Sequence, residues 1–274
     1  MRDSTQRFWR DPQMPHVESR RACDSRACYR AHSHPTFSIG SVDAGESVFS
    51  DALNGSTLLR PGHLVFVPPE RVHACNPAPH APWSYQMLHL SASWLEAWLL
   101  SPAGRALRPV WHDRIWISQA PALYQHFCAL NQLLFSDKSP AAKNAAIQAF
   151  LTDGLGGDHH RRTLPMQGEE YSARVSPALK VLGQANADAF SNAQLASLCG
   201  MSPYQFIRAF KACTGLTPHA WQLNRRVSLA RGDLRSGLDI ADTAHDHGFA
   251  DQSHFHRTFK AHTAVTPGQY KTPH

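Results

Sequence analysis

The pattern of hydrophobic and polar positions changes along the chain, from a period of two to a period of three and four. Over residues 28–90, apolar and polar side chains alternate in short runs that glycines interrupt. Alternation with a period of two is typical of strands, and several short strands separated by turns favour an antiparallel barrel or sandwich. The predicted strands cover residues 28–34, 36–42, 47–51, 56–69, 72–77 and 83–90.

Helical spacing begins at about Trp94. Segments 120–135 and 140–155 carry apolar residues three and four apart, and SDKSP between them predicts a turn, so two helices should form an antiparallel pair. The pair can pack on the barrel or form a dimer interface, because both kinds of apolar face look alike in sequence. Segment 156–173 lacks apolar periodicity and is the predicted linker.

The C-terminal part of the chain contains an internal repeat. FIRAFKACTGLTPHAW at residues 206–221 returns as FHRTFKAHTAVTPGQY at residues 255–270, with matching Phe, Arg, Lys, Thr and Pro positions. Upstream, Gly200 pairs with Gly248, which leaves one extra residue between glycine and phenylalanine in the second copy. A change of one residue belongs in a turn.

Each copy predicts a short helix, a glycine turn and a second helix. The first helices are expected at residues 193–199 and 240–247, and Ser202 and Asp251 are candidate N-caps of the second helices. This is the helix-turn-helix arrangement, in which the second helix enters the DNA major groove. A single copy would favour an ordinary helical hairpin, but two copies with matching basic residues favour DNA binding.

Apolar spacing divides each second helix into an inner and an outer face. The inner positions are Phe206 and Phe210 in the first copy and Phe255 and Phe259 in the second. Residues on the outer face or at the N-terminal turn are candidates for contacts with bases and phosphates. These candidates are Ser202, Tyr204, Gln205, Arg208, Lys211, Asp251, Gln252, Ser253, His254, His256, Arg257 and Lys260.

A connecting helix is predicted from Pro218 to about Leu234. Its apolar positions are Trp221, Val227, Leu229 and Leu234, and the positions expected to face solvent are Arg225, Arg226 and Arg231. If this helix is rigid, it holds the two recognition helices about 34 Å apart, one turn of the DNA duplex.

Charge and composition agree with this division. Residues 174–274 hold 11 Lys and Arg against 6 Asp and Glu, whereas residues 1–173 hold 16 against 15. A basic excess suits a phosphate-bearing partner, although charge alone also fits a solvated basic surface.

The remaining composition excludes several classes of protein. A content of 42% hydrophobic residues argues against wholesale disorder. No apolar run reaches the roughly 18 residues that a membrane-spanning helix needs, and the N-terminal segment has no signal-peptide core. Six cysteines in 274 residues fit reduced thiols. We therefore expect a cytoplasmic protein without a membrane partner.

The segment from Arg174 to Lys271 resembles the DNA-binding domain of AraC-type (AraC/XylS) transcriptional regulators, whose signature here is HGFADQSHFHRTFKAHTAVTPGQYK. The resemblance implies binding to double-stranded promoter DNA, activation more often than repression, a homodimer, and RNA polymerase as a further partner. One departure is Ala264, which stands where the first copy has Gly215. A left-handed conformation there would cost free energy with alanine.

The region in front of this domain resembles a cupin barrel. HSH at residues 32–34 and PGHLVFVPPERVH at residues 61–73 correspond to the two cupin motifs, and AraC-type regulators hold a small effector in such a barrel. The cavity is expected to be mostly apolar with a few polar groups. The candidate effector-binding residues are His32, His34, Phe37, Phe66, His73 and Tyr85, with Trp83 as a further candidate.

The histidines also raise the question of a metal. His32 and His34 stand two apart on a predicted strand, His73 occupies the second-motif position, and Cys75 or Cys28 could complete a site that suits zinc. The glutamate of the cupin metal pattern is missing. Strand histidines also often satisfy internal hydrogen bonds, so we favour an organic effector and no required cofactor.

Together these patterns predict an α+β protein with a cupin-like antiparallel β-barrel and packed helices at residues 1–155, a linker at 156–173, and an all-α domain of two helix-turn-helix units at 174–274. The predicted function is a sequence-specific DNA-binding transcriptional regulator controlled by a small molecule, and not an enzyme. The alternatives are a metal-binding cupin enzyme or sensor fused to a DNA-binding domain, and a regulator that needs no effector.

Overall fold

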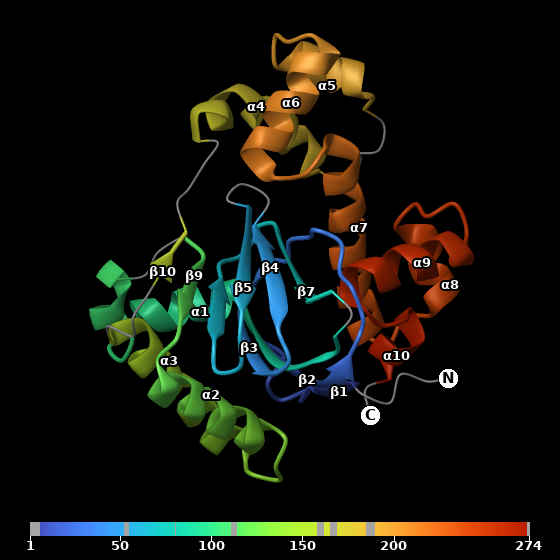
Figure 1. Cartoon of the computed structure of the whole chain (residues 1–274). Coiled ribbons are helices and arrows are strands. Elements are labelled where there is room, and N and C mark those ends of the chain that lie inside the picture. The colour runs from blue at the N-terminus through green and yellow to red at the C-terminus, as the bar shows by residue number, and fades with distance from the viewer. Residues whose placement is uncertain are drawn as a thin grey trace.

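The computed structural model describes residues 6–51, 55–79, 81–110, 114–157, 162–164, 169–184 and 190–272. An N-terminal barrel carries helices on one side, and two helical units follow it (Figure 1). The predicted class, α+β with a barrel in front of an all-α domain, is confirmed. No helix in the described part of the chain is long and apolar enough to cross a membrane.

The barrel consists of two antiparallel sheets. The larger has the strand order β1(Gln6–Trp9), β2(Val17–Ser25), β8(Trp83–Ser91), β3(Thr36–Ala44), β6(Leu64–Val67), β9(Trp116–Ser118), β10(Arg162–Thr163). The smaller has the order β5(Gly55–Leu59), β4(Ser47–Asp51), β7(His73–Pro77). Alternation predicted β3 to β8, with β5 and β6 as one strand, but it missed β1, β2, β9 and β10. The predicted strand at residues 28–34 is reduced to an isolated bridge between His32 and His73.

Both faces of the large sheet are apolar, and they belong to different cores. Phe37 and Phe66 point outward into a core shared with the helices, whereas Val65 and Val67 point into the barrel. Successive side chains of a strand alternate between faces, which separates these neighbours. Outside the sheet lie α1(Ala92–Leu100), a 3-10 helix η1(Arg105–Val110), α2(Pro121–Leu134) and α3(Pro140–Gly156).

The predicted helical pair packs on the barrel. Its buried residues, among them Phe127 and Phe150, share one core with Phe37 and Phe66 of the large sheet. Of the two arrangements that the sequence left open, packing on the barrel is therefore the one found within the chain.

The C-terminal region holds the predicted tandem units. The first consists of α4(Glu169–Leu182), α5(Asn192–Leu198) and α6(Pro203–Thr214); α7(Pro218–Arg235) connects it to α8(Ile240–Asp246), α9(Gln252–Thr263) and α10(Pro267–Lys271). The predicted linker is partly structured, because it contains β10 and the first turn of α4; its other residues lie largely outside the described ranges.

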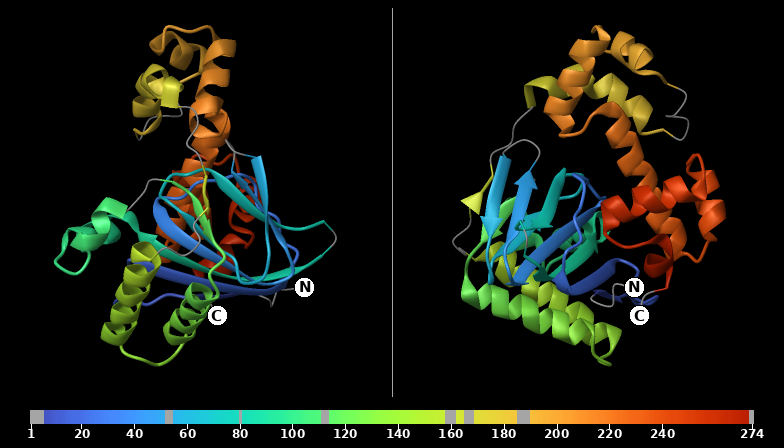
Figure 2. Two further views of the ribbon diagram at one scale, coloured as in Figure 1. Left: turned by 60° about the vertical axis from the view of Figure 1, so that its left-hand side comes forward. Right: turned by 45° about the vertical axis from the view of Figure 1, so that its right-hand side comes forward.

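The two units sit differently with respect to the barrel. The first stands above it, and the second lies against its side (Figures 1 and 2). Phe8 of β1 belongs to the same core as Phe255 and Phe259, whereas the described residues of the first unit's core all come from residues 171–221. The barrel therefore completes the core of the second unit.

Candidate functional site

The two recognition helices, α6 and α9, present polar faces to solvent. Phe206, Phe210, Phe255 and Phe259 are fully buried, as predicted. Most candidate DNA-contact residues are exposed: Ser202, Tyr204, Gln205, Arg208, Lys211, Asp251, Gln252, Ser253, Arg257 and Lys260. His254 and His256 were expected to face out, but they are half-buried. The ring of His254 lies edge-on to Phe249, with centroids 5.5 Å apart.

The predicted caps begin both helices. Ser202 Oγ accepts from the Gln205 amide, while the Gln205 side chain accepts from the Ser202 amide at 3.0 Å, which forms a capping box. Asp251 Oδ1 accepts from the His254 amide at 2.6 Å. Gln205 therefore stabilises the helix end, a role that differs from the base contact expected for it.

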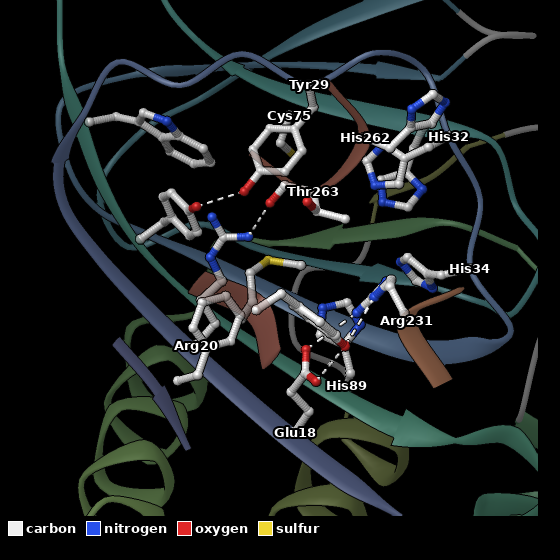
Figure 3. A pocket seen from close by; sticks show the side chains of 16 residues that line it. Glu18, Arg20, Tyr29, His32, His34, Cys75, His89, Arg231, His262 and Thr263 are labelled. Atoms are coloured by element: carbon white, nitrogen blue, oxygen red, sulfur yellow. Dashed lines mark hydrogen bonds and ion pairs between the residues drawn. The ribbon is translucent and has the colours of Figure 1, made fainter. Parts of the chain in front are cut away.

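A pocket lies between the barrel and the second unit (Figure 3). Barrel residues on its wall include Glu18, Arg20, Tyr29, His32, His34, His73, Tyr85 and His89. The C-terminal domain contributes Arg231, His262, Thr263 and Tyr270. Neither domain forms this site alone.

Glu18 of β2 is the centre of the contacts that close the pocket. Its carboxylate accepts from Arg10 at 2.8 Å, from Arg231 at 3.3 Å and from the Tyr270 hydroxyl at 2.9 Å. Burial acts to raise the pKa of Glu18, but the charges of Arg231 and Arg10 outweigh it and hold the pKa well below its usual range. The carboxylate is therefore charged although it is only 3% exposed.

Further hydrogen bonds join the two domains around this centre. Arg20 Nη1 donates to the Thr263 carbonyl at 2.8 Å, and the Arg30 amide donates to the Ala261 carbonyl at 2.8 Å. At the other end, Asn224 of α7 exchanges hydrogen bonds with the amide and the hydroxyl of Ser33. These polar contacts hold the second unit to the barrel together with the apolar contact of Phe8.

The placement of Arg231 corrects the sequence prediction. It was expected on the solvent side of the connecting helix, together with Arg225 and Arg226. Instead, its guanidinium turns toward the barrel and bonds to Glu18 and Tyr270. Helical spacing identified the outer face of α7, but it could not show that the barrel covers part of that face.

The predicted histidines come together in the pocket. The ring centroids of His32 and His73 are 4.8 Å apart, and those of His34 and His73 are 5.0 Å apart. His89 joins them, 4.9 Å from His34. Burial lowers the pKa of all four, to about 3 for His89, so these rings are neutral near neutral pH.

The four-ligand metal site expected from His32, His34, His73 and Cys75 is not formed. In the described residues, no three His, Cys, Asp or Glu side chains are placed to hold one metal ion. Cys75 packs against the inner core of the barrel, and burial raises its thiol pKa to about 12. Cys28 is exposed. Zinc binding stays a prediction, which metal analysis of the purified protein tests.

The structure places some of the candidate effector-binding residues on the pocket wall and others elsewhere. His32, His34, His73 and Tyr85 line the pocket, as does Trp83, whereas Phe37 and Phe66 lie in the outer core. Two further wall residues, Met87 and His89, alternate with Trp83 and Tyr85 along β8, so the period of two could have identified them. The other missed residues come from distant segments, and no sequence signal joins them: Phe8, Glu18, Arg20, Tyr29, Arg231, His262, Thr263 and Tyr270.

A barrel with a pocket in front of two helix-turn-helix units defines a ligand-binding DNA-binding regulator. Comparison with known families agrees. The "AraC-like ligand binding domain" matches residues 15–153, and a "Helix-turn-helix domain" matches residues 195–272. The chain belongs to the AraC family of transcriptional regulators.

Relatives span most of the chain. The uncharacterized HTH-type transcriptional regulator YbfI of Bacillus subtilis is 24% identical, over 93% of this chain and 90% of its own length. The arabinose operon regulatory protein of Salmonella typhimurium is 25% identical, over 83% and 80%. ToxT from Vibrio cholerae shares the fold, with a TM-score of 0.56, 11% identity and 97% of both chains covered.

Proposed function

We propose that a small effector in the interdomain pocket controls DNA binding by changing how the second helix-turn-helix unit docks on the barrel. The observation that supports this most directly is the origin of the pocket wall, which comes from both domains. A ligand that touches both sides has a different affinity for the docked and the undocked arrangement. Only such a difference allows a ligand to shift the population between them.

A structural neighbour with a bound ligand supports control of this fold by a small molecule. A further ToxT structure, with a TM-score of 0.57 over 97% of this chain and 93% of that one, holds an unsaturated fatty acid. The pocket here is lined by histidines and arginines as well as aromatic rings, which suits a ligand with more polar groups than a fatty acid has.

The proposal also retains what the family resemblance implies: the protein activates transcription as a homodimer that contacts RNA polymerase, and it is not an enzyme. YbfI and the arabinose operon regulatory protein are transcriptional regulators, which supports a role in transcription. A reporter fused to a selected operator tests the sign of regulation, and analytical ultracentrifugation tests the dimer.

Substitution of Glu18 by Gln tests the coupling between docking and DNA binding. The change keeps the shape of the side chain but leaves Arg10 and Arg231 without their buried countercharge, at a cost of about 3 to 5 kcal/mol. We expect a larger radius of gyration in X-ray scattering. We also expect a change of about tenfold or more in affinity for a duplex selected with the wild-type protein.

The matched control is Glu46→Gln, which removes an exposed ion pair with Arg60 on the barrel surface. Such a pair contributes little, so neither the shape nor the DNA affinity should change. An opened Glu18→Gln protein that binds DNA with wild-type affinity would contradict the proposal.

A further inference from the structure

The charges around the pocket do not balance. Among the described residues, the pocket wall holds two guanidinium groups, those of Arg20 and Arg231, and one carboxylate, that of Glu18, and Arg10 pairs with the same carboxylate from outside the wall. Glu18 pairs with Arg10 and Arg231, and these two ion pairs already share its oxygens. The seam between the domains therefore carries more buried positive than negative charge.

Arg20 is the cation with the least compensation. It is 7% exposed, and its two terminal nitrogens donate to the neutral oxygens of Thr263 and Gln6. In the described part of the chain, no carboxylate forms an ion pair with it, and its Nε has no hydrogen-bond partner. Arg20 is compensated only by the field of Glu18, with which it forms no ion pair, and by the faces of the Phe8, Tyr29 and Tyr85 rings, so an anion in this pocket gains from its charge.

Three histidines on the pocket wall offer acceptors. Nδ1 of His32, His73 and His262 lies 2.8 to 2.9 Å from the backbone carbonyls of Arg30, Arg71 and Thr258, respectively. A carbonyl can only accept, so each Nδ1 carries the proton and each neutral ring leaves Nε2 as an acceptor. Burial lowers the pKa of all three rings, which keeps them neutral.

These acceptors have no protein donors, and they come from both domains. For Nε2 of these three rings, the described residues provide no hydrogen-bond partner. His32 and His262 lie on one side of the pocket in Figure 3, although His32 belongs to the barrel and His262 to α9. A ligand that donates hydrogen bonds to both would bridge the domains.

The arrangement of the three Nε2 acceptors indicates which chemical group of a ligand could bind to them. No three of the described His, Cys, Asp and Glu side chains can hold one ion, so a metal does not meet these acceptors together. An ammonium group would add charge to a seam that is already positive. Hydroxyl groups on neighbouring carbons are neutral donors, and they can be spread over several atoms.

The size of the pocket limits the ligand. The cavity measures about 60 Å³. A buried water needs roughly 10 to 15 Å³ of such space, so the pocket holds on the order of five waters, or a ligand of about two to four carbons with its oxygens.

We propose that the effector is a small hydroxylated carboxylic acid. Its carboxylate lies in the field of Arg20 and Arg231, and each of its hydroxyl groups donates to one of the Nε2 atoms of His32, His73 and His262. The ligand class deepens the function proposed above and rests on it for its regulatory meaning.

Isothermal titration of the full chain in the presence of a chelator tests the ligand class with matched probes. Glycerate carries the carboxylate and two hydroxyls; propionate lacks the hydroxyls, glycerol lacks the carboxylate, and serine replaces one hydroxyl by an ammonium. We expect glycerate, or its relatives glycolate, lactate and tartrate, to bind at least about tenfold more tightly than propionate, glycerol or serine. Equal affinity for glycerate and glycerol, equal affinity for glycerate and propionate, or no binding of any hydroxy acid would overturn the proposal.

Two substitutions test the hydroxyl-binding histidines and the carboxylate-binding arginine separately. His262→Leu should reduce the affinity for the hydroxy acid toward that for propionate and leave propionate binding unchanged. The control is His256→Leu on the same helix, because His256 does not line the pocket. Arg20→Met should weaken both acids. If that variant does not fold, the probe series on the wild-type protein still decides, because it needs no substitution.

A failure of the proposed ligand class can be distinguished from a failure of the proposed function. If no hydroxy acid binds while Glu18→Gln still changes DNA affinity, the ligand class is wrong and the coupling stands. If glycerate binds with the expected preference but DNA affinity is the same with and without it, the ligand class stands and the regulatory role fails.

Discussion

The two helix-turn-helix units are copies with the same core and different surroundings. Phe206 and Phe210 of the first correspond to Phe255 and Phe259 of the second, and all four are fully buried. The copies differ mainly where the second meets the barrel. Cys213 and Trp221 in the first unit become His262 and Tyr270 in the second, and both of these line the pocket. A repeated fold thus acquires a docking surface while its core phenylalanines stay the same.

The largest expected effect tests the shared core. Phe210→Ala and Phe259→Ala should each destabilise their unit by about 3 to 5 kcal/mol, because a fully buried ring is lost. Phe259 packs against Tyr270, with ring centroids 5.5 Å apart, so its loss should also loosen the docking, whereas the loss of Phe210 should not. Urea denaturation followed by circular dichroism measures the first effect, and X-ray scattering measures the second. A Phe259→Ala protein with wild-type stability would mean that the second core is misassigned.

The next prediction compares the exposed faces. Arg208→Ala and Arg257→Ala should each weaken binding to a selected duplex by about 1 to 3 kcal/mol, because each loses a contact with a base or a phosphate. Both side chains are exposed, so the melting temperatures should stay close to wild type. Fluorescence anisotropy at fixed salt measures the affinities, with Arg105→Ala on the barrel as the control. If only Arg208→Ala weakens binding, the second unit does not contact DNA in its docked position.

A third comparison isolates the docking hydroxyl. Tyr270→Phe removes one hydroxyl, which donates to Glu18 at 2.9 Å and accepts from Arg231 at 3.1 Å. Hydrogen bonds to buried charged groups contribute about 1.5 to 3 kcal/mol, so the docked state should lose stability on this scale. Trp221→Phe at the corresponding position of the first unit should leave the docking unchanged, since Trp221 faces Phe210 of its own core. Hydrogen exchange of β2 and α10 measures the difference. Equal protection of these segments in the two variants would show that the Tyr270 hydroxyl does not stabilise the docking.

The sequence predicted the two helix-turn-helix units better than it predicted the docking of the second unit on the barrel. The reasons are physical. Helical spacing and caps are local, and they placed the core phenylalanines, Ser202 and Asp251 correctly. Alternation found Trp83 and Tyr85 of β8 but not Met87 and His89, and it could not decide which face of the sheet Phe37 and Phe66 occupy, because both faces are apolar. Arg231 was placed on the wrong side because its partner, Glu18, lies 213 residues earlier in the chain. A buried ion pair between distant segments leaves no periodic signal.

The smallest expected effect concerns the helix ends that follow α6 and α9. Gly215 has φ 81° and Ala264 has φ 61°, so the predicted left-handed conformation occurs in both copies. An alanine in this conformation costs about 1 to 2 kcal/mol, and Gly215→Ala should destabilise the first unit by this amount. Ala264→Gly relieves the same strain but removes a buried methyl group that contributes about 0.8 kcal/mol. The stability of the second unit should therefore rise by less than the relief of strain alone would give. Thermal melts of the two variants measure the asymmetry. A gain from Ala264→Gly as large as the loss from Gly215→Ala would show that the Ala264 methyl group contributes nothing to the second core.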